Sequence, residues 1–384
     1  MLPTDSPTSP FHVVIAGGGV AALEAGLALR EIGGDRFRIT MIAPDPDFVY
    51  RPMTVREPFA YGPAMRYGIA EFAAQIDAEL LSDRLAWLDC GDRVVHTADG
   101  GQTGYDALIL GLGARPRPRY EHALTVDDRQ LDEILHGLIE DVEGGYVHNL
   151  AFVLPAGAAW PLPIYELALM TAGRAFDMNV DLAVTIVTPE RVPLASFGDG
   201  ASGAVAQLLA EAGITTIASA TCEVPDSRHV VIEPGDRQLA VDRVIALPEL
   251  HGPSIRGLPA GEHGFIPIDP HCRVRGVEHV YAAGDATDYP LKYGGIAAQQ
   301  ADTAAQAIAA TAGIPVESSP LHPVIHGILL TGAAPLYLTA RIIGGQGFSS
   351  ASSDTPVEPP PAKISARYLT PYLEERDRVA SAAR

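Results

Sequence analysis

Short apolar runs alternate with Ala- and Leu-rich stretches of helical spacing along most of the chain. Residues 11–16 predict a strand, residues 20–32 a helix and residues 37–43 a second strand. Three glycines separate the first strand from the helix. The beginning of the chain therefore predicts a βαβ unit with parallel strands.

The same alternation starts again near residue 150. The repeated elements are a strand at residues 150–154, a helix at 165–175, a strand at 183–187 and a helix at 201–212. Residues 280–283 then predict a buried strand that leads through Gly284 and Asp285 to a helix from about residue 295 to 311. This order predicts an α/β fold with two Rossmann-like dinucleotide-binding domains, the second inserted in the first.

Two other regions complete the pattern. Residues 85–110 predict three short strands with a glycine turn at Gly100 and Gly101, followed by an apolar run. A smaller C-terminal region begins near residue 321. Its Ser/Pro-rich stretch at 349–361 predicts a loop or linker, and residues 363–369 predict a short strand or helix.

Composition and charge exclude several classes of function. The 384 residues include 27 basic and 47 acidic side chains, a net charge of −20 that repels nucleic acid and anionic lipid surfaces. The chain shows no basic-then-apolar leader and no apolar stretch of spanning length, so a cytoplasmic protein with no transmembrane segment is expected. Cys90, Cys222 and Cys272 form no CxxC pair, so neither a redox-active dithiol nor a metal site is expected.

The glycine turn after the first strand is the first candidate site. Its residues, which fit GxGxxA, are Gly17, Gly18, Gly19, Val20, Ala21 and Ala22. Glycines there let backbone amides approach a pyrophosphate, and the helix N-terminus adds partial positive charge. The acidic residue that usually grips a ribose at the end of the second strand is replaced by Ala43. Either Asp45 or the backbone around Ala43 must take that role.

The second motif is Gly284-Asp285, at the end of the strand predicted for residues 280–283. A carboxylate in this position can accept hydrogen bonds from a flavin ribityl chain. Lys292, Gly294, Gly295 and a helix follow, a context that distinguishes the motif from an ordinary Gly-Asp turn.

With these motifs the chain resembles the pyridine nucleotide-disulfide oxidoreductase superfamily, and within it the branch of sulfide:quinone oxidoreductases and type II NADH dehydrogenases. The resemblance spans almost the whole chain. Besides residues 17–22 and 284–285, it rests on Tyr50-Arg51-Pro52, Tyr105-Asp106, Gly111-Leu112-Gly113-Ala114, residues 264–269 and Gly294-Gly295-Ile296-Ala297.

The resemblance implies an FAD-binding domain at residues 1–116 and 260–320, an NAD(P)-type domain at 117–259 and a C-terminal interface region at 321–384, with a homodimer expected. The implied cofactor-binding residues are Gly17, Gly18, Gly19, Val20, Ala21, Ala22, Ala43, Arg51, Gly113, Ala114, Gly284, Asp285, Lys292, Gly295 and Ile296. Arg51, Pro52 and Lys292 are implied neighbours of the flavin ring. The helix near Gly295 would direct its positive N-terminus at that ring.

The second domain departs from the family pattern. Residues 154–166 contain a single glycine, and Pro161 and Pro163 remove amide donors that a pyrophosphate would need. This loop argues against NAD(P)H binding, although the resemblance retains NAD(P)H as a donor. Sulfide oxidation needs cysteines beside the flavin, and the chain has Trp160 in this loop and no cysteine after Cys272.

The sequence therefore predicts an FAD-dependent oxidoreductase that passes two electrons between a donor and a quinone, small molecule or redox protein. Two alternatives stay open at this point. One is a flavoprotein module that works with a protein partner, and the other is a degenerate member that binds FAD without turnover.

Overall fold

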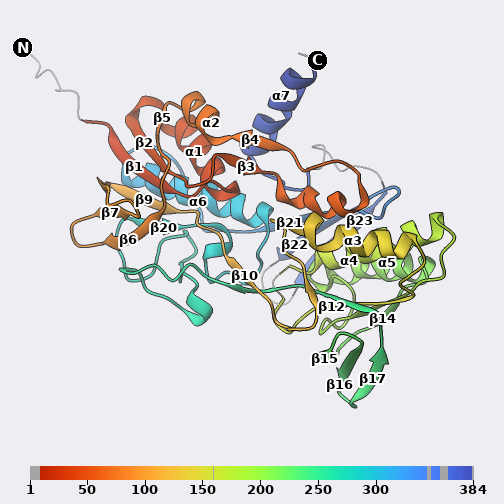
Figure 1. Ribbon diagram of the computed structural model, residues 1–384. Helices are drawn as coiled ribbons and strands as arrows, with labels where there is room; N and C mark the ends of the chain where they lie inside the picture. The colour runs from red at the N-terminus through yellow and green to blue at the C-terminus, as the bar shows by residue number, and fades with distance from the viewer. Residues whose placement is uncertain (1–8, 159, 344–346, 355–361, 383–384) are drawn as a thin grey trace, which may run out of the picture.

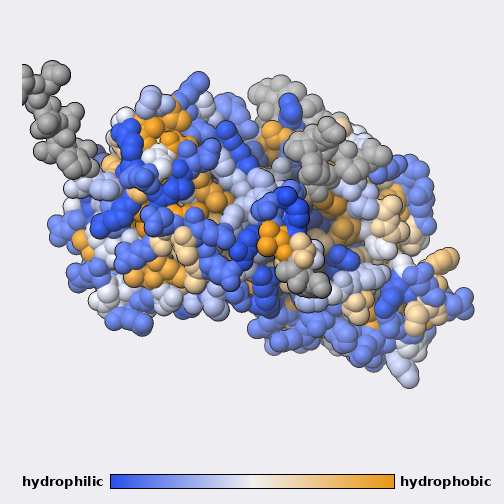
Figure 2. Space-filling view, turned by 90° about the horizontal axis from the view of Figure 1, so that it is seen from above, coloured by the Kyte–Doolittle hydropathy of each residue, from blue (hydrophilic) through white to orange (hydrophobic). Residues whose placement is uncertain are grey.

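The computed structural model describes residues 9–158, 160–343, 347–354 and 362–382. Two parallel sheets with their helices lie at opposite ends of an elongated molecule (Figure 1). We call the part built on the first sheet the first unit, and the part from β11 to β18 the second unit. Hydrophilic side chains predominate on the face shown in Figure 2, interrupted by separate apolar patches.

Five parallel strands form the first sheet in the spatial order β20–β9–β1–β2–β5. They are β1 (Phe11–Ala16), β2 (Phe37–Ile42), β5 (Ala78–Leu81), β9 (Ala107–Leu110) and β20 (Val280–Ala282). Val13, Val14 and Ile15 are completely buried, as expected for a central parallel strand covered on both faces. Helices α1 (Val20–Gly33) and α6 (Gly294–Thr311) pack side by side on this sheet.

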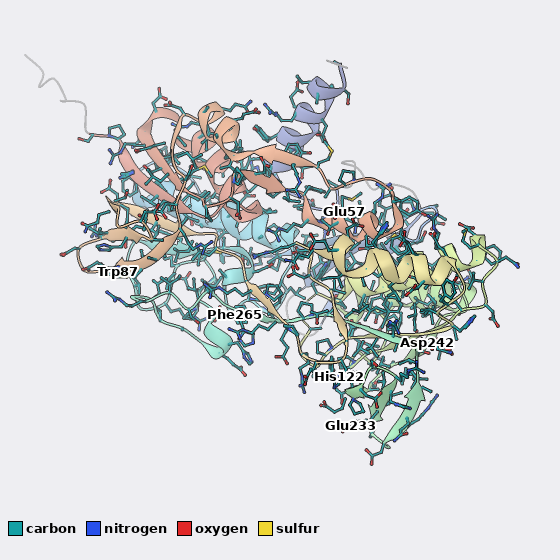
Figure 3. The ribbon with its side chains drawn as sticks, viewed as in Figure 1. Glu57, Trp87, His122, Glu233, Asp242 and Phe265 are labelled. Carbon is teal, nitrogen blue, oxygen red and sulfur yellow. The ribbon has the colours of Figure 1, made fainter. Side chains whose placement is uncertain are left out.

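Smaller elements complete the first unit. The residues predicted as three short strands form an antiparallel meander of β6 (Leu85–Asp89), β7 (Val94–Thr97) and β8 (Gln102–Gly104). The others are the helices η1 (Gly34–Arg36), η2 (Arg51–Phe59), α2 (Ile69–Gln75), η4 (Glu262–Gly264) and η5 (Gly284–Ala286) and the paired strands β3 (Asp47–Val49) and β4 (Arg66–Gly68). Glu57, labelled in Figure 3, marks where η2 reaches across to α3 of the second unit.

The second sheet is also parallel, in the order β11–β18–β12–β13–β14. Its strands are β11 (Leu124–Thr125), β12 (Asn149–Val153), β13 (Ala183–Val187), β14 (Thr215–Ile217) and β18 (Arg243–Ala246). Its helices are α3 (Leu131–Glu143), α4 (Leu162–Asp177), η3 (Ala195–Phe197) and α5 (Gly198–Glu211). An antiparallel sheet of β15 (Thr221–Asp226), β16 (His229–Glu233) and β17 (Arg237–Ala240) projects from its edge (Figure 1).

The strand that leads into the second unit and the strand that leads out of it lie side by side. The outgoing strand β10 (Arg115–Arg117) pairs antiparallel with the returning strand β19 (Glu249–His251). All strands of the second sheet lie between these two in the sequence, so the α/β fold with one Rossmann-like unit inserted in another is confirmed.

The C-terminal region differs from its prediction in two places. Strands β21 (Val324–Leu329), β22 (Leu336–Ile343) and β23 (Gly347–Ser353) form an antiparallel sheet beside α5. The loop predicted at 349–361 is therefore wrong for its beginning, and residues 355–361 lie outside the described residues. Residues 363–368 form neither strand nor helix, and helix α7 (Leu369–Ala382) begins only after them. None of the helices in the described ranges is long and apolar enough to cross a bilayer.

Candidate functional site

The glycine turn between β1 and α1 is fixed by close backbone packing. Gly17 has φ +134°, and a Cβ on it would lie 2.2 Å from the carbonyl oxygen of Gly111, so only glycine fits. A Cβ on Gly18 would lie 2.6 Å from the side chain of Ile69. Gly19, in contrast, has no atom within 4 Å of its Cβ position and precedes the first helical residue, Val20. The amides of Val20 and Ala21 have no intrahelical acceptor, as at any helix start, whereas the Ala22 amide donates to the Gly19 carbonyl at 3.0 Å.

Three predicted segments meet at this turn. A Cβ on Gly111 would contact the Ala22 amide nitrogen at 3.1 Å, and one on Gly284 would lie 3.4 Å from the Ala21 Cβ. Gly284 has φ +78°, and its amide donates to Gln300 Oε1 on α6 at 2.7 Å. The glycine turn, the segment after β9 and the Gly284-Asp285 motif are therefore neighbours at the carboxyl edge of the sheet, where ligands of α/β folds bind.

Two further predicted residues flank this point. Ala43 is buried, donates its amide to the Leu81 carbonyl at 3.1 Å, and has its Cβ 3.3 Å from the Cβ position of Gly18. It thus lies beside the turn but offers a methyl group in place of a carboxylate, and Asp45 is exposed. Gly113 has φ +69° with open space at its Cβ position, and Ala114 beside it is half-buried.

Two charged residues that influence each other's pKa, Asp285 and Lys292, follow β20. Lys292 is only 7% exposed, donates a short hydrogen bond to the Thr287 carbonyl, and lies 4.1 Å from the ring centroid of Phe265 (Figure 3 labels Phe265). Burial lowers the pKa of Lys292 to about 8, against the opposing influence of the Asp285 and Asp288 carboxylates. Lys292 is thus a buried cation, a setting that favours a role in the site over that of a solvated lysine.

Asp285 lies on η5, directly after β20. Burial raises the pKa of Asp285 to about 6, and the positive charges of Lys292 and Arg51 oppose this rise. Within the part of the chain that the structure describes, the Asp285 carboxylate accepts no hydrogen bond. The Asp285 side chain is half-buried, so its carboxylate is partly withdrawn from water and still open to a ligand.

Arg51 connects the site to the second unit. Its guanidinium pairs with Asp128, which follows β11, at 2.9 Å, and both side chains are partly exposed. Pro52, the next residue of η2, is half-buried. Nothing in the sequence indicated Asp128, because its approach to Arg51 depends on how the two units pack.

The start of α6 is enclosed by aromatic and C-terminal residues. A Cβ on Gly295 would lie 2.5 Å from the Tyr293 hydroxyl, and one on Gly294 would lie 2.8 Å from Ile364. The Ile296 side chain is 1% exposed, and its amide donates to the Tyr293 carbonyl at 3.1 Å. Packing therefore accounts for both glycines, and the side chain of Ile296 belongs to the core.

The C-terminal segment 362–369 crosses this end of α6 and joins the two units. Lys363 forms a buried ion pair with Glu166 of α4 at 2.5 Å. The Ile364 amide donates to the Tyr50 hydroxyl at 2.9 Å. The amides of Tyr368 and Leu369 donate to the buried Glu24 carboxylate of α1. Sequence reasoning missed this crossing, which has no local signal.

Part of the chain matches a known protein family. Residues 166–311, which run from α4 to the end of α6, match the family model described as pyridine nucleotide-disulphide oxidoreductase. This match covers less than half of the chain, and it supports the pyridine nucleotide-disulfide oxidoreductase superfamily that the sequence motifs predict. The matched stretch contains Gly284, Asp285 and Lys292, but begins after the loop at 154–161.

Two known proteins resemble the chain at low identity. The oxidoreductase ptaL of Pestalotiopsis fici is 24% identical over 314 residues, 72% of this chain and 77% of the relative. The ferredoxin reductase component of chlorobenzene dioxygenase from a Cupriavidus species is 24% identical over 302 residues, 74% and 69% of the two chains.

Two solved structures show the same fold. The sulfide:quinone oxidoreductase of Aquifex aeolicus superposes with a TM-score of 0.80 at 18% identity, covering 90% of this chain and 87% of that one. The ferredoxin reductase of the CYP199A2 system of Rhodopseudomonas palustris gives 0.67 at 20% identity, covering 89% and 88%.

Proposed function

We propose that the protein is an FAD-dependent oxidoreductase whose flavin lies along the carboxyl edge of the first sheet. The observation that carries this proposal is the Asp285 carboxylate, which follows Gly284 where three glycine segments meet. It accepts no hydrogen bond from the described residues, and the charge of the buried cation Lys292 acts on it. A flavin offers hydroxyl donors for the carboxylate and negative charge for the cation.

The residues present fit the cofactor. The open space at Gly19 and the amides that begin α1 suit a diphosphate, which helix N-termini bind well. Gly113 leaves room for a ligand beside the strand ends. When bound, FAD accepts and releases two electrons. Lys292 and the N-terminus of α6 would raise the positive potential around it, and Arg51 with Pro52 would border the ring.

The unit division is part of the same proposal. We propose FAD binding by residues 1–116 and 260–320, a second domain at 117–259 and an interface region at 321–384. The pairing of β10 with β19 supports the two inner boundaries, because β10 precedes all strands of the second sheet in the sequence and β19 follows them. A cytoplasmic location and a homodimer complete the proposal, and light scattering tests the latter.

The names of similar proteins suggest the electron acceptor. Ferredoxin reductases and a sulfide:quinone oxidoreductase are among them. Cys222 and Cys272 are buried, and Cys90 contacts the Gly257 carbonyl on the far side of the first sheet from the second unit, so a sulfur relay is not supported. We therefore propose an iron–sulfur protein or a quinone as acceptor, to be tested with the prereduced flavoprotein and each acceptor in turn.

Flavin release on denaturation tests the central claim. We expect the purified protein to be yellow and to release FAD. Asp285→Asn should raise the Kd for FAD about 10- to 100-fold, the range for losing hydrogen bonds to a charged group. The matched control is Asp288→Asn, because an asparagine oxygen can still accept from the Ile268 amide. A colourless protein that cannot be reconstituted with FAD would overturn the proposal.

A further inference from the structure

We propose that the second unit binds no dinucleotide, because its own side chains occupy and close the place where one would bind. The donor that reduces the flavin is therefore not NAD(P)H. This inference rests on the proposed function and specifies its electron donor.

The first observation is the shortage of amide donors at the start of α4. A phosphate-binding helix start needs several free amides directed at the ligand. Pro161 precedes this helix and Pro163 lies in its first turn, so neither residue has an amide hydrogen. The Ile164 amide already donates to the Pro161 carbonyl at 3.1 Å. Only the Leu162 amide remains there, whereas at the start of α1, where the Ala22 amide donates to the Gly19 carbonyl in the same way, the amides of both Val20 and Ala21 remain.

The second observation is an aromatic stack across the mouth of the second unit. The indole of Trp160, in the loop between β12 and α4, lies parallel to the Tyr293 ring, with centroids 4.3 Å apart and planes at 11°. Phe197 lies on another side of the indole, with a centroid distance of 5.6 Å. The Tyr293 hydroxyl is held in turn by the His326 amide at 3.1 Å. Trp160 thus bridges the carboxyl end of β12 and the beginning of α6.

The third observation concerns Glu190, which lies just after β13 where a dinucleotide-binding domain presents an acidic residue to the ribose. One carboxylate oxygen accepts the hydroxyl of Tyr165 at 2.7 Å, and the other accepts the Ala195 amide at 2.9 Å. Tyr165 is completely buried. Both oxygens of Glu190 therefore serve the protein's own structure.

Each observation affects a different contact of a dinucleotide. The prolines affect the pyrophosphate contact, the aromatic stack the nicotinamide contact and Glu190 the ribose contact. A dinucleotide would have to replace an aromatic stack, break the Glu190 hydrogen bonds and bind a helix start that lacks donors. No single side-chain movement provides all three contacts.

Anaerobic stopped-flow reduction of the FAD-loaded protein tests the donor. We expect no bleaching of the flavin by millimolar NADH or NADPH over seconds, and complete bleaching by dithionite. Saturable reduction by either nucleotide would overturn the inference. Failure of the proposed function would be distinguishable, because the preparation would then lack the flavin spectrum before any donor is added.

Binding without chemistry is tested by the fluorescence of the two tryptophans, Trp87 and Trp160. In Trp87→Phe, emission reports on Trp160 alone, and in the matched variant Trp160→Phe it reports on Trp87, in the distant meander (Figure 3). We expect titration with NAD⁺ or ADP-ribose to lower the emission of both variants by the same small amount, linearly with nucleotide concentration. A saturable change confined to Trp87→Phe would overturn the inference.

Discussion

The two units share a plan in which a buried parallel strand leads to a helix, but they differ at the connection. Residues 17–19 join β1 to α1 through three glycines, of which the backbone requires Gly17. Residues 154–161 join β12 to α4 through a loop that contains Trp160 and ends in Pro161. The same topology thus presents free amides in one unit and an aromatic stack in the other. Binding depends on the connection, and the fold alone does not specify it.

The largest expected effect comes from adding one methyl group to the glycine turn. Gly17→Ala should destabilise the protein by about 3 kcal/mol or more, because it combines backbone strain at φ +134° with overlap at the Gly111 carbonyl. Thermal unfolding followed by circular dichroism measures the loss.

Gly19→Ala is the matched control for that variant. Its methyl group would enter open space, so stability should change by less than about 1 kcal/mol. The FAD Kd should nevertheless rise at least about tenfold if this space receives the diphosphate. Unchanged FAD affinity in Gly19→Ala would remove the turn from the binding site.

In the second unit we expect a substitution to lower stability and to leave flavin binding unchanged. Glu190→Ala should lower the free energy of unfolding by about 2–3 kcal/mol, because it leaves the Tyr165 hydroxyl and the Ala195 amide without their acceptor. Flavin content should stay unchanged. Denaturant unfolding and flavin absorbance measure the two quantities, and Glu190→Gln should be milder because one oxygen remains.

The smallest expected effect is a shift in the flavin midpoint potential. Lys292→Met should lower it by on the order of 30–60 mV, since a nearby cation favours the anionic reduced flavin by a few kcal/mol and 30 mV corresponds to about 1.4 kcal/mol for two electrons. Dye-linked potentiometry measures the shift.

The pH dependence provides the control for Lys292→Met. Because the pKa of Lys292 is lowered to about 8, the amine is charged below that pH and progressively neutral above it. The difference between wild type and variant should therefore be largest at pH 6–7 and shrink above pH 8. A difference independent of pH would assign the effect to packing against Phe265.

Local pattern is sufficient for the central strands of both sheets and for helices α1, α4, α5 and α6, because apolar periodicity reports burial over a few residues. It did not predict four other strands, β5, β11, β14 and β18, or helix α3. Local pattern does not predict features that depend on tertiary contacts. Residues 363–368 have no regular structure because the amides of Ile364 and Tyr368 donate to side chains of the first unit, Tyr50 and Glu24. The Trp160–Tyr293 stack was likewise invisible, since its rings are far apart in sequence.

The candidate site also contains residues that local motifs predict and residues that only tertiary packing brings in. The sequence motifs selected Gly17, Gly284 and Asp285, which the structure brings together, because short glycine motifs encode backbone geometry directly. Asp128 had no motif and approaches Arg51 only through the packing of the two units. Gly295 was selected for a ligand, and its contact with Tyr293 provides an alternative reason for the glycine.

The pairing of β10 with β19 has a consequence for how such proteins change. The chain leaves the first unit at Arg117 and returns at Glu249, and these two residues are direct partners in a short ladder. A different segment inserted between them would leave the ends of the first unit in place, provided that it keeps partners for Arg51, Lys363 and Tyr293. A relative with a functional glycine turn in its second unit could donate that segment, and the chimera would acquire a new reductant while keeping its own flavin site.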